Sequence, residues 1–353
     1  LEGAYRSTLV SHGVELVPGR AVICGPGQVA AGGREWRARH ILVATGARPH
    51  VPDIPGAALG ITSNEMFHLD RLPRRALICG AGFIALEFAG ILHEFGVEVT
   101  LVVRSDRLLR GWDQALVDRL LAILTEKGIG IRFHHEPTAL EPAADGAIRM
   151  QCANGRSLEG DLVLWATGRV PNSAGLGLGE LGLSLAANGA IPVDAASHTA
   201  LPWLHAVGDV TDRLQLTPVA IREGHALADT LFGGRAWTVD HALVPKAVFS
   251  HPPLASVGLT EAEARTRLGD VRIFTSDFRP MKNVLAGRNE RALYKLVVDA
   301  ATDRVVGAHL LGPDSPEILQ ALAIAVKAGL SKEQIDQTVA LHPTMAEELV
   351  LMK

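Results

Sequence analysis

One glycine-rich turn constrains the fold of this chain more than any other feature. Arg75–Cys79 is an apolar run typical of a buried strand, and the next residues read Gly80-Ala-Gly-Phe-Ile-Ala85. The apolar-rich stretch Leu86–Phe95 predicts a helix, and Val97–Val103 predicts the following strand. This order is a βαβ unit with G-x-G-x-x-A at its first turn, which indicates a dinucleotide-binding fold.

Each small residue of the turn has a physical reason to be small. Gly80 permits the tight turn, Gly82 lets the backbone approach a pyrophosphate, and Ala85 keeps the helix close to the sheet. The N–H groups at the start of the helix would face the phosphates. A purely structural glycine turn is the alternative, and the strand and helix on either side make it the weaker one.

The end of the second strand predicts which nicotinamide cofactor binds. NAD binders place an acid there to hold the ribose 2′-hydroxyl. Here the strand ends in Val103-Arg104, with Arg110 shortly after, while Glu98 sits at the start of the strand, too far away. Two arginines offer forked cationic donors that suit a 2′-phosphate, although a solvated surface pair would look the same in sequence. We therefore expect NADPH.

A repeated segment indicates two related α/β domains. His40–Gly46 and Leu162–Gly168 both read as buried strands that end in Ala-Thr-Gly, and both are followed by an arginine and a proline. The second copy has its glycine-rich loop upstream, at Gly80. The same offset would put the loop of the first copy before Leu1, so we expect the start of the first domain to be missing from this sequence.

The remaining segments extend this architecture. Leu204–Val207 predicts another strand, and Thr217–Phe232 predicts a helix with Thr217 as its N-cap and Pro218 as its first residue. Beyond about Asp240 strands and helices no longer alternate, which predicts a separate α+β domain. Its expected strands are Val271–Phe278, Leu293–Val298 and Val305–Leu311, and its expected helices are Glu261–Leu268, Glu317–Lys327 and Lys332–Thr338, the last with Ser331 and Gln334 at capping-box spacing.

Composition excludes several other classes. A chain of 353 residues is long enough for two or three domains. Its net charge of −4 argues against nucleic acid or an anionic membrane as a partner, and no apolar run approaches about 20 residues. The three cysteines, Cys24, Cys79 and Cys152, lie far apart with no C-x-x-C pair and no metal spacing, which fits a reducing, cytoplasmic setting and no bound metal.

Seven motifs together make the chain similar to the glutathione reductase family, the class I pyridine nucleotide-disulfide oxidoreductases. They are Gly80–Glu87, Arg104 with Arg110, Ala166–Asn172, Ala206–Asp209, Leu216–Ala220, Phe249–Leu254 and Leu341–Glu348. The resemblance implies an α/β protein in which a Rossmann-like NADPH domain is inserted in a truncated FAD-binding domain and followed by an α+β dimerisation domain. The implied boundaries are 1–49 and 173–240 for the incomplete FAD-binding domain, 50–172 for the NADPH domain and 241–353 for the dimerisation domain.

The resemblance also assigns cofactor residues. For NADPH they are Gly80, Ala81, Gly82, Ile84, Glu87, Arg104, Arg110, Gly168, Arg169 and Leu216, and for FAD they are Ala44, Thr45, Gly46, Asp209 and Thr217. Asp209 would accept a ribityl hydroxyl, and Thr217 would open a helix whose positive end stabilises an anionic flavin. Without the resemblance, a plain turn residue and a plain helix cap would be the better interpretations of these two residues.

His342 and Glu347 match the acid/base pair of the family. An imidazole can protonate a leaving thiolate near neutral pH, and a carboxylate on its other nitrogen fixes the tautomer. Thr344 and Glu347 also have capping-box spacing, which is a structural alternative for the glutamate. The resemblance implies a homodimer in which His342 completes the partner's site, and it places Tyr5 near the substrate, glutathione disulfide.

Some residues depart from the family pattern. Phe83 stands where a tyrosine usually covers the flavin, and His225 stands where an arginine is frequent. The redox-active Cys-x-x-x-x-Cys does not occur, so we expect the chain as given to be inactive alone. Two alternatives therefore stay open beside a glutathione reductase: a sibling reductase for lipoamide or mercuric ion, and a non-catalytic, dimeric NADPH-binding protein. A lipoamide enzyme would favour an acid in place of Arg104.

Overall fold

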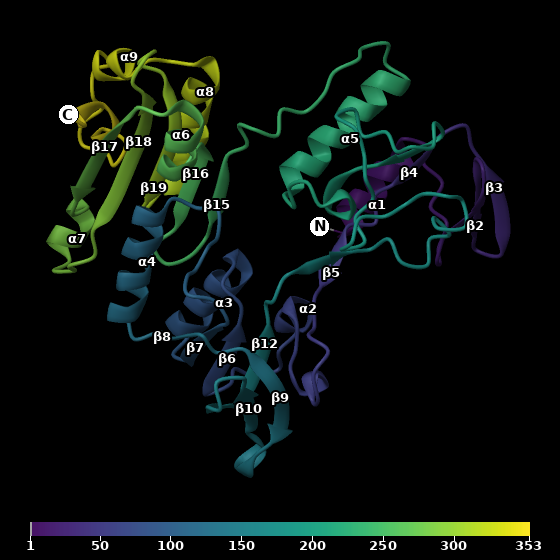
Figure 1. Cartoon of the computed structure of the whole chain (residues 1–353), viewed down its shortest axis with the longest axis horizontal. Coiled ribbons are helices and arrows are strands. Elements are labelled where there is room, and N and C mark those ends of the chain that lie inside the picture. The colour runs from purple at the N-terminus through teal and green to yellow at the C-terminus, as the bar shows by residue number, and fades with distance from the viewer. Residues whose placement is uncertain (1) are drawn as a thin grey trace. The chain divides into compact units, whose positions relative to one another are not determined.

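The computed structural model describes residues 2–353 and divides them into two compact units. The first unit combines the residues up to Arg48 with Arg169–His241 (Figure 1). The second unit combines Pro49–Gly168 with Ala242–Lys353, so it contains both the nucleotide segment and the C-terminal domain predicted from the sequence. The first unit is thus interrupted in sequence by the nucleotide segment.

A four-stranded parallel sheet forms the centre of the nucleotide segment. Its strands are ordered β12-β6-β7-β8, and its helices follow β6 and β7 as βαβ connections require. Ala85, Leu86 and Ala89 on the inner face of the first helix are fully buried against the sheet. The elements are β6 (Arg75–Cys79), α3 (Phe83–Glu94), β7 (Glu98–Val103), α4 (Gln114–Glu126), β8 (Gly130–Phe133) and β12 (Leu162–Trp165), preceded by η1 (Ala57–Leu59) and α2 (Ser63–Met66).

The glycine turn shows why its residues are small. Gly80 has a φ of 147°, and a Cβ there would lie 2.2 Å from the carbonyl oxygen of Ala166. Gly82 faces open space, and Ala85 has no exposed surface. Helix α3 begins at Phe83 rather than at the expected Leu86, because Gly82 already serves as its N-cap.

A small antiparallel sheet covers one side of the parallel sheet, and the sequence did not predict it. Its strands are ordered β11-β10-β9. Met150 and Leu140 pack there against Leu77, Val163 and other residues of the parallel strands. The strands are β9 (Pro137–Pro142), β10 (Ile148–Cys152) and β11 (Ser157–Gly160), with η2 (Ala144–Gly146) between the first two.

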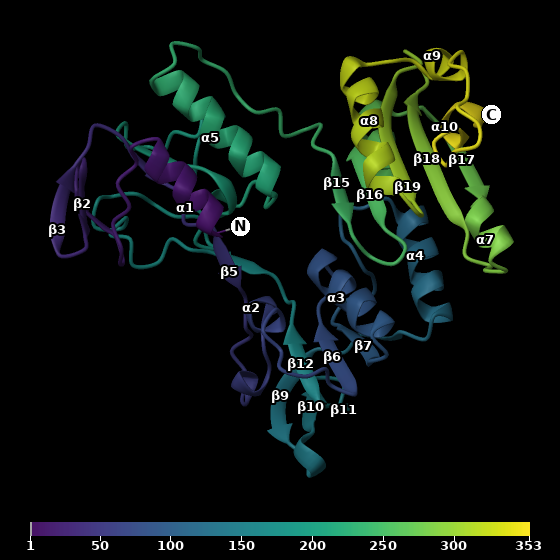
Figure 2. The ribbon, with the colours of Figure 1, turned by 180° about the vertical axis from the view of Figure 1, so that it is seen from behind.

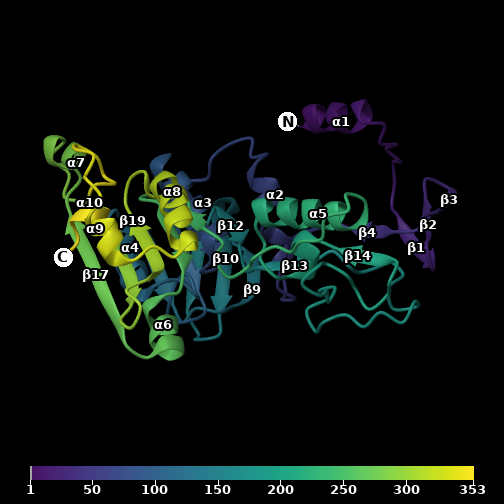
Figure 3. The same ribbon diagram turned by 90° about the horizontal axis from the view of Figure 1, so that it is seen from above.

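The C-terminal domain is a five-stranded antiparallel sheet ordered β15-β16-β19-β18-β17. Helix α8 packs along β16 and β19 (Figures 2 and 3), and α9 and α10 lie at the end of the chain. The strands are β15 (Lys246–Val248), β16 (Leu254–Gly258), β17 (Val271–Phe278), β18 (Ala292–Asp299) and β19 (Val305–Leu311). The helices are α6 (Glu261–Leu268), α7 (Met281–Leu285), α8 (Ser315–Ala328), α9 (Lys332–Asp336) and α10 (Glu348–Leu351).

These elements confirm the pattern-based expectations for this part of the chain. Strands β17 and β19 have the predicted bounds, as does α6. Helix α9 ends two residues early, at Asp336, but its capping box forms as predicted, with the Ser331 hydroxyl accepting from the backbone N–H of Gln334.

The first unit surrounds a smaller core. Strands β4 and β14 pair in parallel, β5 pairs with β13, and β1, β2 and β3 form an antiparallel sheet. Ile41, Leu204 and Ile191 are central to the core. The elements are α1 (Glu2–Ser11), β1 (Val22–Gly25), β2 (Gln28–Ala31), β3 (Arg34–Arg37), β4 (Ile41–Val43), β5 (Ala47–Pro49), β13 (Arg169–Pro171), β14 (Leu204–Ala206), η3 (Gly208–Thr211) and α5 (Thr217–Leu231).

The start of α5 differs from the prediction. Leu216 is the N-cap, so Thr217 is the first helical residue and Pro218 the second. Proline is tolerated at either place because the N–H groups of a first helical turn have no partner within the helix. Within residues 2–353 no helix has the length and apolar character needed to cross a membrane.

A histidine cluster in the first unit makes its stability depend on pH. Burial, with the nearby rings of His198 and His40, lowers the pKa of His205 to about 4, against the attraction of Asp194. The unfolded chain would take up this proton near pH 6.5 and the folded one only near 4, so the stability contributed by the neutral ring is present above pH 6.5 and is lost between these values.

We therefore expect the free energy of unfolding to fall on acidification from about pH 7 to about pH 5, and to fall less in His205→Leu, which has no proton to bind there. Urea unfolding monitored at several pH values measures this. The matched control is His12→Leu, which removes an exposed histidine of the same unit. An identical pH slope in wild type and His205→Leu would contradict the assignment.

Candidate nucleotide and disulfide-reduction sites

A cavity of about 450 Å³ opens at the carboxyl edge of the parallel sheet. Such an edge, above a glycine-rich turn, is where dinucleotides bind in this class of fold. Gly80, Ala81 and Gly82 line this cavity, and so do Arg104 and Arg110. The cavity thus brings together six residues predicted for NADPH, which are Gly80, Ala81, Gly82, Arg104, Arg110 and Gly168.

The two predicted 2′-phosphate arginines are unpaired. Within residues 2–353 neither Arg104 nor Arg110 has an acidic partner, and both are exposed. Their neighbours differ, since Arg107 pairs with Asp106 and Arg119 with Asp277. Two free guanidinium groups at one cavity wall leave their donors available to an anionic group.

Phe83 and Glu87 lie at the start of α3. Phe83 lines the cavity and its side chain is 41% exposed. The carboxylate of Glu87 accepts a hydrogen bond from the backbone N–H of Phe249 at 3.0 Å. Burial raises the pKa of Glu87 against the effect of this bond. Glu87 therefore joins the nucleotide segment to the C-terminal domain, and its contact with a cofactor stays a prediction, as does that of Ile84.

Two other residues predicted for NADPH belong to the first unit. Arg169 donates from Nη2 to the carbonyl oxygen of Ala47 at 2.6 Å, and its Nε lies 4.0 Å from the carboxylate of Asp209. Leu216 is the N-cap of α5. The structure thus places Arg169 beside a residue predicted for FAD, and the cofactor assignments of Arg169 and Leu216 stay predictions.

The predicted FAD residues occupy strand ends and a helix start. The Thr45 hydroxyl donates to the carbonyl oxygen of Asn172 at 2.7 Å, and Ala44 and Gly46 flank it directly after β4. Asp209 lies in η3, just beyond the end of β14, and Thr217 is exposed at the start of the 15-residue helix α5. These are positions where a ligand can meet a carboxylate and a positive helix end.

Glu223 anchors this region and was missed in the sequence. It is 2% exposed, and its carboxylate accepts from the backbone N–H of Gly208 at 2.7 Å, from Arg213 at 2.8 Å and from His241 Nε2 at 2.7 Å. Through its bond to Gly208, the buried Glu223 carboxylate fixes the turn that carries Asp209. A single glutamate within an ordinary helical pattern gives no signal of this role.

His342 and Glu347 form the predicted pair. His342 Nδ1 lies 2.9 Å from a carboxylate oxygen of Glu347, and the side chains are 74% and 13% exposed. The Thr344 hydroxyl accepts from the backbone N–H of Glu347, so one half of the alternative capping box also forms. The carboxylate itself lies on the histidine, which is the geometry that fixes an imidazole tautomer.

The cysteines of the chain are separate. Cys79 and Cys152 are buried and Cys24 is exposed, and all three are free thiols. Burial raises the pKa of the Cys79 thiol, and it raises that of Cys152. Buried neutral thiols are poor nucleophiles, so neither is suited to disulfide exchange.

Tyr5 in α1 and His225 in α5 are both exposed, and their roles stay predictions. The described residues contain no cluster of His, Cys, Asp and Glu able to hold a metal.

Comparison with known proteins defines the class. Residues 1–224 match the family of pyridine nucleotide-disulphide oxidoreductases, and residues 244–353 match the dimerisation domain of that family. The chain belongs to this family. The match confirms the predicted resemblance, the fold class with a nucleotide-binding part followed by a dimerisation domain, and FAD and NADPH as the cofactors.

Two individual relatives and one solved structure are also similar to this chain. The whole chain is 49% identical to glutathione reductase of Burkholderia cepacia, of which it spans 78%, and 42% identical to the chloroplastic/mitochondrial glutathione reductase of Pisum sativum, of which it spans 64%. Among solved structures, the HOCl-induced flavoprotein disulfide reductase RclA from Escherichia coli is similar with a TM-score of 0.88 at 29% identity, over 95% of this chain and 78% of that one.

The arginine pair leads to a direct prediction. Arg104→Glu combined with Arg110→Ala should weaken NADPH binding by at least about 100-fold, since two charged hydrogen-bond donors are lost and each contributes about 1.5–3 kcal/mol. NADH lacks the 2′-phosphate and should be affected much less. Titration of both cofactors by fluorescence measures the difference, with Arg107→Ala as the control. Equal loss for NADPH and NADH would contradict the 2′-phosphate role.

Proposed function

We propose that the protein is an NADPH-dependent flavoprotein that reduces glutathione disulfide to glutathione. Two relatives that match the whole length of the chain are named glutathione reductase. The observation that carries the proposal is the 2.9 Å contact between His342 and Glu347. A dinucleotide site alone would fit many oxidoreductases, whereas this pair provides the proton that a thiolate leaving group needs.

Different residues of the chain would bind the cofactor and donate the proton. The Gly80–Gly82 turn would hold the pyrophosphate of NADPH, and Arg104 with Arg110 would hold its 2′-phosphate. Bound FAD would take electrons from NADPH and pass them to a disulfide. His342 would donate a proton to the leaving thiolate of the substrate.

The candidate flavin residues fit the group in chemical terms. Asp209 offers a carboxylate beyond the end of β14, and Gly208 before it has a φ of 72°. The start of α5 offers backbone N–H groups and a partial positive charge. These two features would bind a hydroxyl of the ribityl chain and the electron-rich edge of a reduced flavin.

The dimer and the placement of His342 are part of the proposal. The His342 side chain is 74% exposed, so most of the ring is accessible, while its carboxylate partner is largely buried. Leu341 and Val339, which precede it, are 74% and 92% exposed. Apolar side chains exposed beside a catalytic histidine are expected where a second copy of the chain covers them. We infer that His342 completes the site of the partner in a cytoplasmic homodimer.

The decisive assay measures NADPH oxidation by the FAD-loaded protein with different disulfide substrates. NADPH oxidation should be rapid with glutathione disulfide and much slower with lipoamide or cystine. A preference for another disulfide would indicate a sibling reductase. NADPH binding without any disulfide turnover would indicate a non-catalytic protein.

His342→Ala tests the acid/base role. Loss of a positioned general acid costs about 10²–10⁴-fold in rate, so disulfide turnover should fall by at least about 100-fold. Reduction of the flavin by NADPH, followed in a stopped-flow experiment, should continue at the wild-type rate. The disulfide turnover of Glu347→Gln should lie between that of the wild type and that of His342→Ala. This variant should also change the pH profile of turnover. Normal turnover in His342→Ala would refute the role.

A further inference from the structure

Residues Leu109–Asp113 form a segment that carries Arg110 to the nucleotide cavity. Leu109, Arg110 and Trp112 line this cavity and also a second one of about 370 Å³. The segment has no regular secondary structure, and two of its residues, Leu109 and Gly111, have φ angles of 45° and 78°. A leucine with positive φ is strained, so this conformation persists only if contacts outside the segment hold it.

One end of the segment is tied to the glycine turn. The backbone N–H of Leu109 donates to the carbonyl oxygen of Ala81 at 2.8 Å, and that of Trp112 donates to the carbonyl oxygen of Leu109 at 3.2 Å. The side chain of Leu109 is 3% exposed. The position of Arg110 is therefore linked by hydrogen bonds to the turn that would hold the pyrophosphate.

Lys246, on strand β15 of the C-terminal domain, contacts the middle of the segment. Its Nζ donates to the carbonyl oxygen of Gly111 at 3.2 Å and lies 4.6 Å from the centre of the Trp112 ring, a cation–π distance. Burial lowers the pKa of Lys246, against the attraction of Glu263. A half-buried lysine that bonds to a backbone carbonyl and an indole has few other orientations available.

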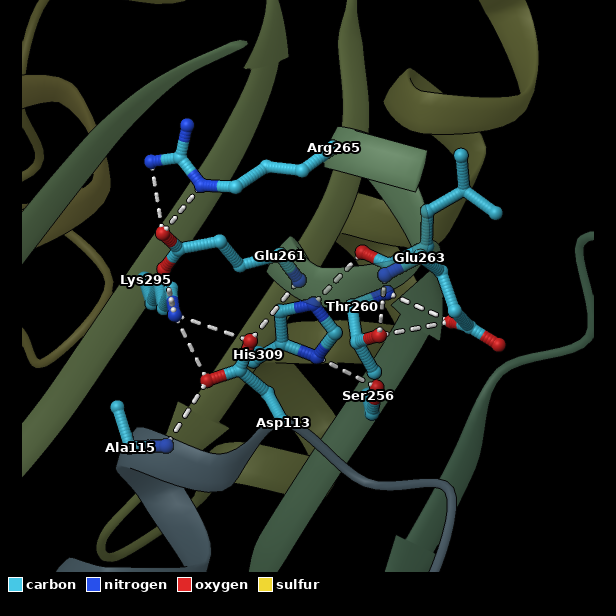
Figure 4. A network of polar contacts seen from close by, with 10 residues as sticks. Asp113, Ala115, Ser256, Thr260, Glu261, Glu263, Arg265, Lys295 and His309 are labelled. Atoms are coloured by element: carbon cyan, nitrogen blue, oxygen red, sulfur yellow. Dashed lines mark hydrogen bonds and ion pairs between the residues drawn. The ribbon is translucent and has the colours of Figure 1, made fainter. Parts of the chain in front are cut away.

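Lys295, on strand β18, holds the other end. Its Nζ lies 2.8 and 3.0 Å from the two carboxylate oxygens of Asp113 and 2.7 Å from Glu261, and its side chain is 4% exposed (Figure 4). Asp113 is also the N-cap of α4, accepting from the backbone N–H of Ala115, and it accepts from that of Glu261. With Arg265 on Glu261, the network contains two cations and two anions.

Two members of this network, Lys295 and Asp113, are buried. Burial alone would raise the pKa of Asp113, but the bonds from Lys295 and from the backbone of Glu261 outweigh it and hold the pKa below its usual range. The two ring nitrogens of the neighbouring His309 are hydrogen-bonded to the Ser256 hydroxyl and to the carbonyl oxygen of Leu259. Buried ions with all their bonds satisfied tolerate little displacement, because any shift exposes an uncompensated charge.

We propose that Lys246 and Lys295 are positioning residues of the dinucleotide site, which fix Arg110 at the cavity wall from within the domain that the family match assigns to dimerisation. This rests on the proposed NADPH function, since it concerns the arginine taken to bind the 2′-phosphate. The C-terminal sheet then sets the preference for NADPH over NADH as well as providing an interface.

Lys246→Met tests the inference in the FAD-loaded enzyme. The methionine keeps the apolar stem but removes the bond to Gly111 and the charge over Trp112. We expect the KM for NADPH to rise about 5- to 20-fold with kcat nearly unchanged, because displacement of a binding group by about 1 Å has effects of this order or larger. The KM for NADH should change little, and Lys246→Arg should restore most of the NADPH preference.

The control variant is Lys127→Met. Lys127 lies at the other end of α4 and also contacts the C-terminal part of the chain, 2.9 Å from Glu290 and 3.1 Å from the carbonyl oxygen of His251. It does not line the cavity, so its loss should lower stability without changing the ratio of the two KM values. A selective rise in the NADPH KM for Lys127→Met would overturn the inference.

A double-variant cycle separates the inference from the proposed function. In an Arg110→Ala background, Lys246→Met should have no further effect on NADPH, since it acts through Arg110. Additive effects of the two variants would overturn the positioning role. If Arg110→Ala alone impaired NADPH and NADH equally, the 2′-phosphate assignment itself would fail. If Arg110→Ala is selective and Lys246→Met is silent, only the inference fails.

Lys295 needs a compensated variant, because its removal alone leaves the buried carboxylate of Asp113 without its cation and can prevent folding. Lys295→Met is therefore combined with Asp113→Asn, which keeps the helix cap, and with Glu261→Gln. Melting temperature reports whether this variant folds. In the folded variant we expect the NADPH KM to rise selectively, and an unchanged NADPH/NADH ratio would remove Lys295 from the proposal.

Discussion

The nucleotide cavity depends on how closely strands β6 and β12 approach each other where they end. The two strands run in parallel, with Cys79 opposite Trp165, and the backbone N–H of Ala166 donates to the carbonyl oxygen of Cys79. A side chain on Gly80 would begin 2.2 Å from the carbonyl oxygen of Ala166 and force the strands apart. Because the turn and the residues after β12 line the same cavity, any such separation would change the site itself.

Some charged side chains in this part of the structure have partners of opposite charge and others have none. The charges without partners indicate where an anionic ligand would bind. Buried ions are costly unless they are paired, and Lys295 has close partners of opposite charge in Asp113 and Glu261. Arg104 and Arg110 have none among residues 2–353 although acidic side chains are plentiful. Two cations left without partners at a concave surface create a positive field that attracts phosphate.

The sequence predicted the local elements well and the long-range contacts poorly. Strand β19 was found because an apolar run bounded by turns is a local signal. Strands β9 to β11 are short and partly exposed, so their pattern resembles that of a loop. The contacts of Lys246 with Gly111 and of Lys295 with Asp113 join positions more than a hundred residues apart, and no periodicity or spacing predicts such pairs.

The pair at the end of the chain shows how one spacing can serve two different contacts of the same glutamate. Thr344 and Glu347 could form a complete capping box, in which the carboxylate would turn back to the backbone. In the structure only the hydroxyl of Thr344 makes its bond, and the carboxylate of Glu347 lies on His342 instead. The half-formed cap fixes the glutamate backbone, and the glutamate fixes the imidazole. The contact with this carboxylate orients the exposed ring, as the proposed role of His342 as a proton donor would require.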